Sequence, residues 1–305
     1  MVRRTYTYVV FGVGLLLLIA GALKLLPGGL MVGGSLCFLG LVLFGLSFVP
    51  RPAESPEPPL PFHERLAALF FEPSRVFRSL RAHPRWLAAL LVIVLLNFAY
   101  STAFTYRLTP ERIVGFTIDK VVESGWMPPE MAEQQKQQQI EQAKDPVQVA
   151  GGAVTSFAWT FVLLCALAAL ALLGVLLLGG RINFWQSLAV LAHAWLPVVI
   201  ISQVLNLILL YIKDPDDIHP TIGSGGLITD NLGALFSPAE HPVLFAAASA
   251  FGVLTFYGVW LTATGLRHGG ERVSSGTAWT VSIAFWVIRV VLAVAASALF
   301  GNFMA

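Results

Sequence analysis

The chain alternates between long apolar runs and short polar segments. Each apolar run is long enough to cross the ~30 Å hydrocarbon core of a bilayer as a helix that rises ~1.5 Å per residue. The pattern therefore predicts an all-α integral membrane protein with about seven transmembrane helices. The runs cover roughly 9–26, 30–49, 86–106, 154–178, 188–212, 243–266 and 278–300.

The first two runs are joined only by Pro27-Gly28-Gly29, so we expect a helical hairpin at 1–49. A signal peptide is disfavoured because no small-residue cleavage site follows the first run. Gly29 and Gly33 form a GxxxG pattern that predicts close contact between helices. Residues 50–61 contain six prolines and should form an extended linker. The remaining residues, 62–305, are expected to form a five-span domain.

Polar segments inside this domain predict structure outside the bilayer. Residues 62–85 read as a pair of short amphipathic helices interrupted at Pro73. Between the first two spans of the domain lies an insert, 108–147, which should form a helical hairpin. Thr109 and Pro110 are expected to be the N-cap and first turn of its first helix. Residues 213–241 are acidic and rich in Gly and Pro, which favours a loop.

The second amphipathic helix combines an apolar side with a basic side. Read at helical spacing, Val76, Phe77 and Leu80 fall on one side. We expect this side to enter the membrane interface and the basic side to face anionic headgroups. The interfacial lipid-binding candidates are Arg75, Arg78, Arg81 and Arg85.

Charge fits this picture and orients it. Charged residues make up only 12% of the chain, against about 25% in soluble domains. With the N-terminus inside, eleven Lys and Arg residues lie on the inner side and seven on the outer side. The positive-inside rule therefore predicts a cytoplasmic N-terminus and an external C-terminus. The two cysteines, Cys37 and Cys165, lie inside apolar runs, which disfavours a disulfide framework.

From residue 66 onward the chain resembles the Yip-domain (Ypt-interacting protein) family of five-span membrane proteins. The resemblance is carried by FFEPSRVFRSLRAHPRW, LLGGRINFWQSLAVLAHAWLP and LTFYGVWLTATGLR, and the insert with TPERI and MPPEMAEQQ is similar to bacterial members. It implies an all-helical membrane domain, location in a bacterial cytoplasmic membrane and, in eukaryotic relatives, partnership with Rab-type GTPases. Where those relatives have an acidic DLYGP-type motif, this chain reads RAHPRW.

The sequence shows no metalloprotease, P-loop or Cys-His metal pattern. Ser224 in TIGSGG lacks the strand–turn–helix context of a catalytic serine, so we interpret it as part of a flexible loop. Asp214, Asp216, Asp217 and His219 could ligate a divalent ion, but a solvated acidic turn is favoured. We expect no metal, no cofactor and no enzymatic activity.

Polar side chains within the spans are the remaining candidates, because each costs free energy in lipid unless it has a partner. Arg289 and Asn97 are expected near the midplane and Gln203 somewhat deeper from the inner side. His193 and Tyr257 should lie nearer that inner boundary. We expect Arg289 to point into the bundle toward an amide, Asn97 or Gln203, or toward a carbonyl freed near Pro197. The alternative is that Arg289 snorkels to the outer interface.

Two functions remain after these considerations. The favoured hypothesis is a non-catalytic scaffold that organises the membrane, with anionic lipids and a membrane-protein partner or second copy as ligands, and no nucleic acid. The alternative is a transporter or channel for a small anion, lined by Arg289, Asn97 and Gln203. The sequence predicts no broken helix pair or inverted repeat, which argues against transport. An intramembrane enzyme is a third and weaker possibility.

Overall fold

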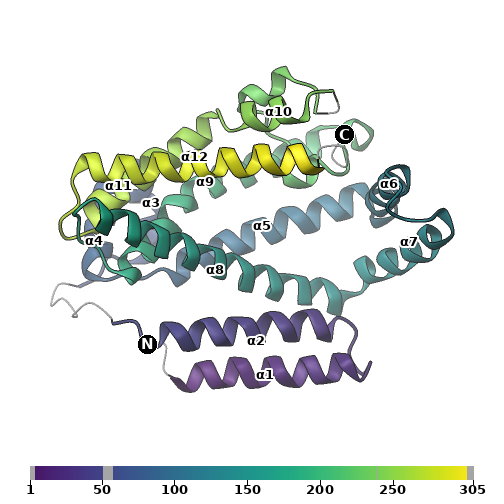
Figure 1. The fold of residues 1–305 in the computed structure, drawn as a ribbon, viewed down its shortest axis with the longest axis horizontal. Coiled ribbons are helices and arrows are strands. Elements are labelled where there is room, and N and C mark those ends of the chain that lie inside the picture. Colours follow the sequence, from purple (N-terminus) through teal and green to yellow (C-terminus); the bar gives the residue numbers. More distant parts are fainter. Residues whose placement is uncertain (1–3, 51–57, 239, 301–305) are drawn as a thin grey trace.

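The structure is a computed structural model that describes residues 4–50, 58–238 and 240–300, and within them the chain is helical (Figure 1). This confirms the predicted fold class. The α-helices are α1 (Arg4–Ala22), α2 (Gly29–Leu46), α3 (Phe62–Phe71), α4 (Pro73–Ala82), α5 (Leu87–Leu108), α6 (Pro110–Glu123), α7 (Pro129–Lys144), α8 (Pro146–Leu177), α9 (Phe184–Ile212), α10 (Pro242–Ser249), α11 (Val253–Gly269) and α12 (Ser275–Phe300).

Among the described residues, α1, α2, α5, α8, α9 and α12 are long and apolar enough to cross a membrane. The expected span at 243–266 is instead divided into α10 and α11, which are separated at 250–252. The prediction of one continuous helix is therefore wrong at this point. Gly252 lies in this break with an extended backbone, at the N-cap position of α11.

The break is stable because neighbouring groups replace the missing helical hydrogen bonds. Trp286 of α12 donates its indole N–H to the carbonyl of Ala250 at 3.0 Å. The carboxylate of Asp230 accepts from the N–H of Leu254 at 2.8 Å, in the first turn of α11. Backbone groups at membrane depth need such partners, because lipid offers none. These partners come from distant parts of the chain, so apolar periodicity could not reveal the break.

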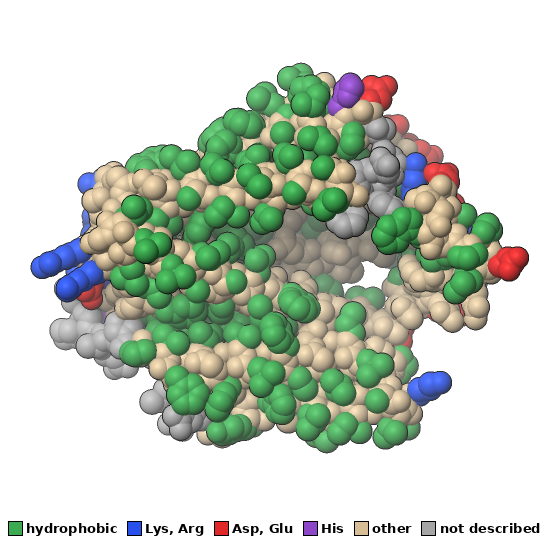
Figure 2. All heavy atoms as spheres, in the orientation of Figure 1, with side chains coloured by type: hydrophobic (Ala, Val, Ile, Leu, Met, Phe, Trp, Pro, Cys, Tyr) green, Lys and Arg blue, Asp and Glu red, His purple; other side chains and the backbone are tan. Residues whose placement is uncertain are grey.

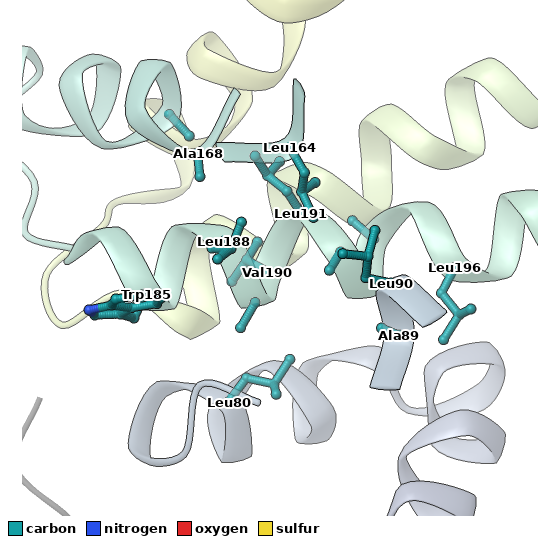
Figure 3. Packing of buried hydrophobic residues seen from close by; sticks show 14 of the residues in the cluster. Leu80, Ala89, Leu90, Leu164, Ala168, Trp185, Leu188, Val190, Leu191 and Leu196 are labelled. Carbon is teal, nitrogen blue, oxygen red and sulfur yellow. The ribbon is translucent and has the colours of Figure 1, made fainter. Parts of the chain in front are cut away.

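Helix α9 is the centre of the bundle, with α5, α8 and α11 packed around it. It starts with a capping box in which Asn183 and Gln186 bond each other's backbone N–H groups. Almost every residue of its first half is buried, which fits a helix surrounded by others. Figure 3 shows Leu80 of α4 pointing toward this helix, near Val190.

The N-terminal hairpin packs on this bundle through α2, which lies against α8 (Figure 1). A Cβ added to Gly29 would lie 2.8 Å from the carbonyl oxygen of Leu17, and one at Gly33 would overlap the backbone of Leu18. The predicted close contact at this GxxxG is therefore confirmed. Most of the expected linker, residues 51–57, lies outside the described residues.

The predicted insert is present as the helix pair α6–α7, with a small core of Val114, Ile118 and Ile140. Thr109 occupies the predicted N-cap position and Pro110 begins α6, but Thr109 has a φ of 68° and its side chain makes no cap hydrogen bond. Helix α8 starts at Pro146, before the expected apolar run, because the Asp145 carboxylate accepts from the N–H of Val147 at 2.9 Å. We call the end of the bundle with α6 and α7 the insert end.

Candidate functional site

The site lies at the opposite end, where α4 covers the ends of α9 and α11 (Figure 1). The sequence suggested that the apolar side of α4 enters the membrane interface. In the structure this side is buried instead. Val76, Phe77 and Leu80 are each at most 1% exposed. A Cβ at Gly265 of α11 would lie 3.0 Å from the Phe77 ring, so the glycine provides the flat surface on which the ring rests. The apolar side therefore binds protein, and the basic side is left exposed.

Helix α9 also holds the end of α4 in position. The side-chain amide of Gln186 donates to the carbonyl oxygen of Arg81 at 2.9 Å. The oxygen of the same amide accepts from the N–H of Asn183 in the capping box at 3.0 Å. One side chain thus fixes the start of α9 and the last turn of α4 relative to each other.

Two short connections meet beside α4. The α8–α9 and α11–α12 connections join through a bridge in which the Arg181 N–H donates to the Arg272 carbonyl at 2.8 Å. A Cβ at Gly180 would lie 3.0 Å from that carbonyl oxygen, and one at Gly270 would lie 3.0 Å from the Arg181 carbonyl oxygen. Small residues at these two positions therefore let the connections approach and bring Arg272 near α4.

These elements enclose an open pocket of ≈ 520 Å³, which we call the arginine pocket. Its charged lining consists of four arginines and one carboxylate, a net formal charge of +3 with His268 neutral. Figure 2 shows Lys and Arg side chains gathered at this end of the molecule. The ionisable lining residues are Arg78, Arg81, Arg267, His268, Glu271 and Arg272.

Four like charges at one site repel one another, and among the described residues none of these arginines forms a salt bridge. Arg75 is different, because it lies outside the pocket and pairs with Glu72 at 3.7 Å. The side chain of Arg85 also lies outside, and its carbonyl accepts a 3.4 Å bond from Arg65. The site therefore contains two of the four arginines expected from the sequence.

Sequence reasoning did not place Arg267 or Arg272 in a site. Their signal was present in RHGGER between two apolar runs, but it was used only to orient the chain. What joins this segment to α4 is the packing of Phe77 on α11. That contact lies between residues almost two hundred positions apart, and no local pattern records it.

The comparison with family models finds a Yip1 domain over residues 67–297, about three quarters of the chain. The chain belongs to the Yip1-domain family. No curated protein and no solved structure matches it in the corresponding searches. The Yip1 match includes the whole arginine pocket, whereas the N-terminal hairpin lies outside it. The protein is thus an integral, multi-span membrane protein of this family.

Within the Yip1 domain, two of the predicted intramembrane residues bind each other. The side-chain amide of Gln203 donates to the Asn97 oxygen at 2.6 Å, and Gln203 in turn accepts from Asn206 at 3.2 Å. The Asn206 oxygen accepts from the N–H groups of Leu227 and Ile228 at 2.8 and 3.0 Å. This chain of amides ties α5 and α9 to the loop at the insert end. Such a use of their polar groups is structural.

Arg289 is not brought to these amides. Its side chain is exposed in the single chain, and its Nη2 donates to the hydroxyl of Thr255 on α11 at 3.4 Å. The predicted partners Asn97 and Gln203 are therefore wrong. The cause is the packing of α12, which lies against α8, α10 and α11, and Thr255 is in the first turn of α11.

His193 is completely buried, and its Nδ1 lies 2.9 Å from the Ala189 carbonyl one turn earlier. Tyr257 stacks on Trp260 with ring centroids 5.8 Å apart. Sequence reasoning overlooked Arg65, which is only 4% exposed. Burial lowers the pKa of Arg65, and nearby Arg85 lowers it further. The Arg65 Nε and the His193 Nε2 both lack a hydrogen-bond partner among the described residues.

The acidic turn at the insert end has local roles. The Asp214 carboxylate accepts from the N–H of Asp216 at 3.0 Å and caps a short 3₁₀ turn. The Asp216 carboxylate lies 3.3 Å from Arg112. His219 Nδ1 accepts from two backbone N–H groups, at Thr221 and Ile222. These polar groups therefore bond the backbone of their own loop and Arg112.

Proposed function

We propose that the protein is a non-catalytic scaffold that organises the membrane around it by binding anionic lipid headgroups in the arginine pocket. The observation that carries the proposal is the convergence of four arginines in an open pocket without salt bridges between them and the described carboxylates. Arginine suits this role because its planar fork donates two parallel hydrogen bonds to a phosphate or carboxylate group.

The proposed orientation places the arginine pocket in the cytoplasm and the insert end outside. It is supported by the excess of Lys and Arg on the pocket side of the spans. Cytoplasmic leaflets carry anionic lipids, and each basic residue near such a surface contributes about 1 kcal/mol to binding. A pocket with four arginines would hold an anionic headgroup more firmly than scattered surface charges can.

The test is to purify the full chain from bacterial membranes in mild detergent and measure the lipids that remain bound. The double variant Arg78→Gln/Arg267→Gln should retain about thirtyfold less anionic lipid, since it loses two arginines that each contribute about 1 kcal/mol. The matched control is Arg75→Gln/Arg85→Gln, which removes the same charge from the same end outside the pocket. Equal losses in both pairs, or no enrichment of anionic lipid in the wild type, would contradict the proposal.

Transport of a small anion remains the second candidate because of the break between α10 and α11. Broken helices within the membrane often form transport sites. Here, however, the break is bonded by Asp230 and Trp286, and Asn97 is bonded to Gln203. These partners favour the scaffold. Anion uptake by reconstituted vesicles that is lost in Arg289→Gln, with normal lipid retention, would favour transport instead.

A further inference from the structure

A second pocket adjoins the arginine pocket. It lies further along α11, toward the start of that helix. It has a volume of ≈ 230 Å³ and is bounded by α4, α11 and the start of α12. It shares Arg267 and His268 with the arginine pocket, so the two form one continuous surface. The remaining lining residues are Ser74, Trp260, Ala263, Thr264, Ser275 and Trp279. We call this second pocket the tryptophan groove.

The lining of the two pockets changes from charged to aromatic along α11. From Arg267 to Trp260 the lining descends seven residues of α11, which corresponds to roughly 10 Å toward the centre of the bilayer. Trp260 and Trp279 are 40% and 41% exposed, so both rings line an accessible surface. The upper part of the surface is therefore cationic, and the lower part is aromatic and at membrane depth.

We propose that the arginine pocket and the tryptophan groove together bind one anionic phospholipid, with its phosphate among the arginines and the start of one acyl chain along the groove. This rests on the proposed function and specifies its ligand. A free anion or a soluble acidic peptide would use only the cationic part. An amphiphile from the adjacent leaflet uses both, and it would arrive already oriented, with its headgroup level with α4.

The lining also limits the headgroup. Glu271 lies in the same pocket as the arginines, and a carboxylate repels a second phosphate but accepts hydrogen bonds from hydroxyl groups. Ser274 and Thr277 line the same pocket, although their hydroxyls bond each other at 3.0 Å. The site therefore favours a single phosphodiester next to a hydroxyl-bearing group, as in a glycerol-type headgroup, over a polyphosphate.

The experiment is a titration of the delipidated full chain, in detergent, with phosphatidylglycerol, followed by native mass spectrometry. Glycerol 3-phosphate is titrated in parallel as a headgroup without chains, and phosphatidylcholine as a lipid without net charge. The groove variant is Trp260→Ala/Trp279→Ala. Its matched control is Trp159→Ala, which removes a similarly exposed ring, 54% exposed, from α8. Trp279→Ala alone serves if the double variant does not fold.

We expect the groove variant to bind phosphatidylglycerol about tenfold more weakly, a change of roughly 1.4 kcal/mol, while its weak binding of glycerol 3-phosphate is unchanged. Trp159→Ala should bind both ligands as the wild type does. Arg78→Gln/Arg267→Gln should lose affinity for both. Phosphatidylcholine should bind much more weakly than phosphatidylglycerol to the wild type, to the groove variant and to Trp159→Ala.

The possible failures are distinguishable. If only the arginine variant weakens phosphatidylglycerol binding, the groove plays no part and this inference is overturned, while the proposed function stands. If glycerol 3-phosphate binds as tightly as the lipid, the ligand is a soluble anion and the inference is again wrong. If the arginine variant binds phosphatidylglycerol like the wild type, both the inference and the proposed function fail.

Discussion

The two ends of the bundle use basic side chains in opposite ways. At the insert end, four basic side chains are paired with carboxylates, in Arg112–Asp216, Lys120–Glu123, Lys136–Asp119 and Lys144–Glu111. At the other end, the four arginines of the pocket have no such partner among the described residues. Paired surface charges contribute modestly to stability and need no ligand. Clustered unpaired arginines repel one another, and a local conflict of this kind is expected at a binding site.

The contrast between the two ends requires first that they lie on opposite sides of one membrane. A single cysteine at Gln138, which is exposed on α7, should react with an impermeant thiol reagent in intact cells. One at Ser275, exposed at the start of α12, should react only after the cells are opened. In intact cells each cysteine should therefore be labelled either fully or not at all. Both variants are made after Cys37 and Cys165 are replaced with alanine. Labelling at Ser275 alone in intact cells would invert the proposed orientation.

The second prediction compares the stabilities of matched arginine variants. Arg112→Gln should lower the free energy of unfolding by about 1–2 kcal/mol, because Arg112 also donates to the Pro215 and Ile218 carbonyls. Arg78→Gln should cost nothing or stabilise slightly, since it relieves repulsion in the pocket. Thermal unfolding midpoints in one detergent provide the measurement. If Arg78→Gln proves as destabilising as Arg112→Gln, the pocket arginines serve the fold and the contrast is lost.

The smallest expected effect is a pH dependence of the loop at the insert end. Burial lowers the pKa of His219 below its ordinary 6.5, and the charge of Lys120 lowers it further. The neutral ring is the form that accepts from the backbone N–H groups of Thr221 and Ile222. The unfolded chain therefore binds this proton more readily than the folded chain. The resulting stability is complete above pH 6.5 and is lost as the pH falls from 6.5 through the lower folded pKa.

Amide hydrogen exchange in the loop at 214–228, measured at several pH values, tests this prediction. Exchange there should accelerate as the pH falls below 6.5, after correction for intrinsic rates, and His219→Gln should remove the effect. A separate loss of stability is expected at lower pH, at the contact between α6 and α7. There the hydrogen bond from Lys144 holds the pKa of Glu111 below its usual 4.5. Protection that is independent of pH in this loop would show that His219 does not stabilise it.

Several local features could be predicted because they depend on local chemistry. Pro73 and Pro110 begin helices where proline is tolerated, and the helical hairpin predicted at 108–147 is present as α6 and α7. The core positions of α4 also followed from helical spacing, since Val76, Phe77 and Leu80 are the buried residues. The spacing showed which side of α4 is apolar. It could not show whether lipid or protein covers that side, because both are equally apolar.

Only two of the four pocket arginines could be predicted, because the sequence does not show which surface covers the apolar side of α4. Arg78 and Arg81 stood out because they lie on one helix with an obvious apolar side. Arg267 and Arg272 join them through the contact of Phe77 with Gly265 and through the bridge from Arg181. Arg289 is a second residue whose partner could not be predicted. Its depth was estimated from the sequence, but its partner Thr255 is set by the packing of α12 on α11.

The sequence by itself determined that the chain is a helical membrane protein, how many apolar runs it contains, which sides of its amphipathic helices are polar, and its membership of the Yip1-domain family. These properties follow from hydropathy and local backbone preference, which act within a few residues. The tertiary structure decided that α4 lies on α11, that four arginines share one pocket, and that α10 and α11 are separate. Each depends on packing and hydrogen bonds between residues far apart in the chain, and no periodicity in the sequence encodes them.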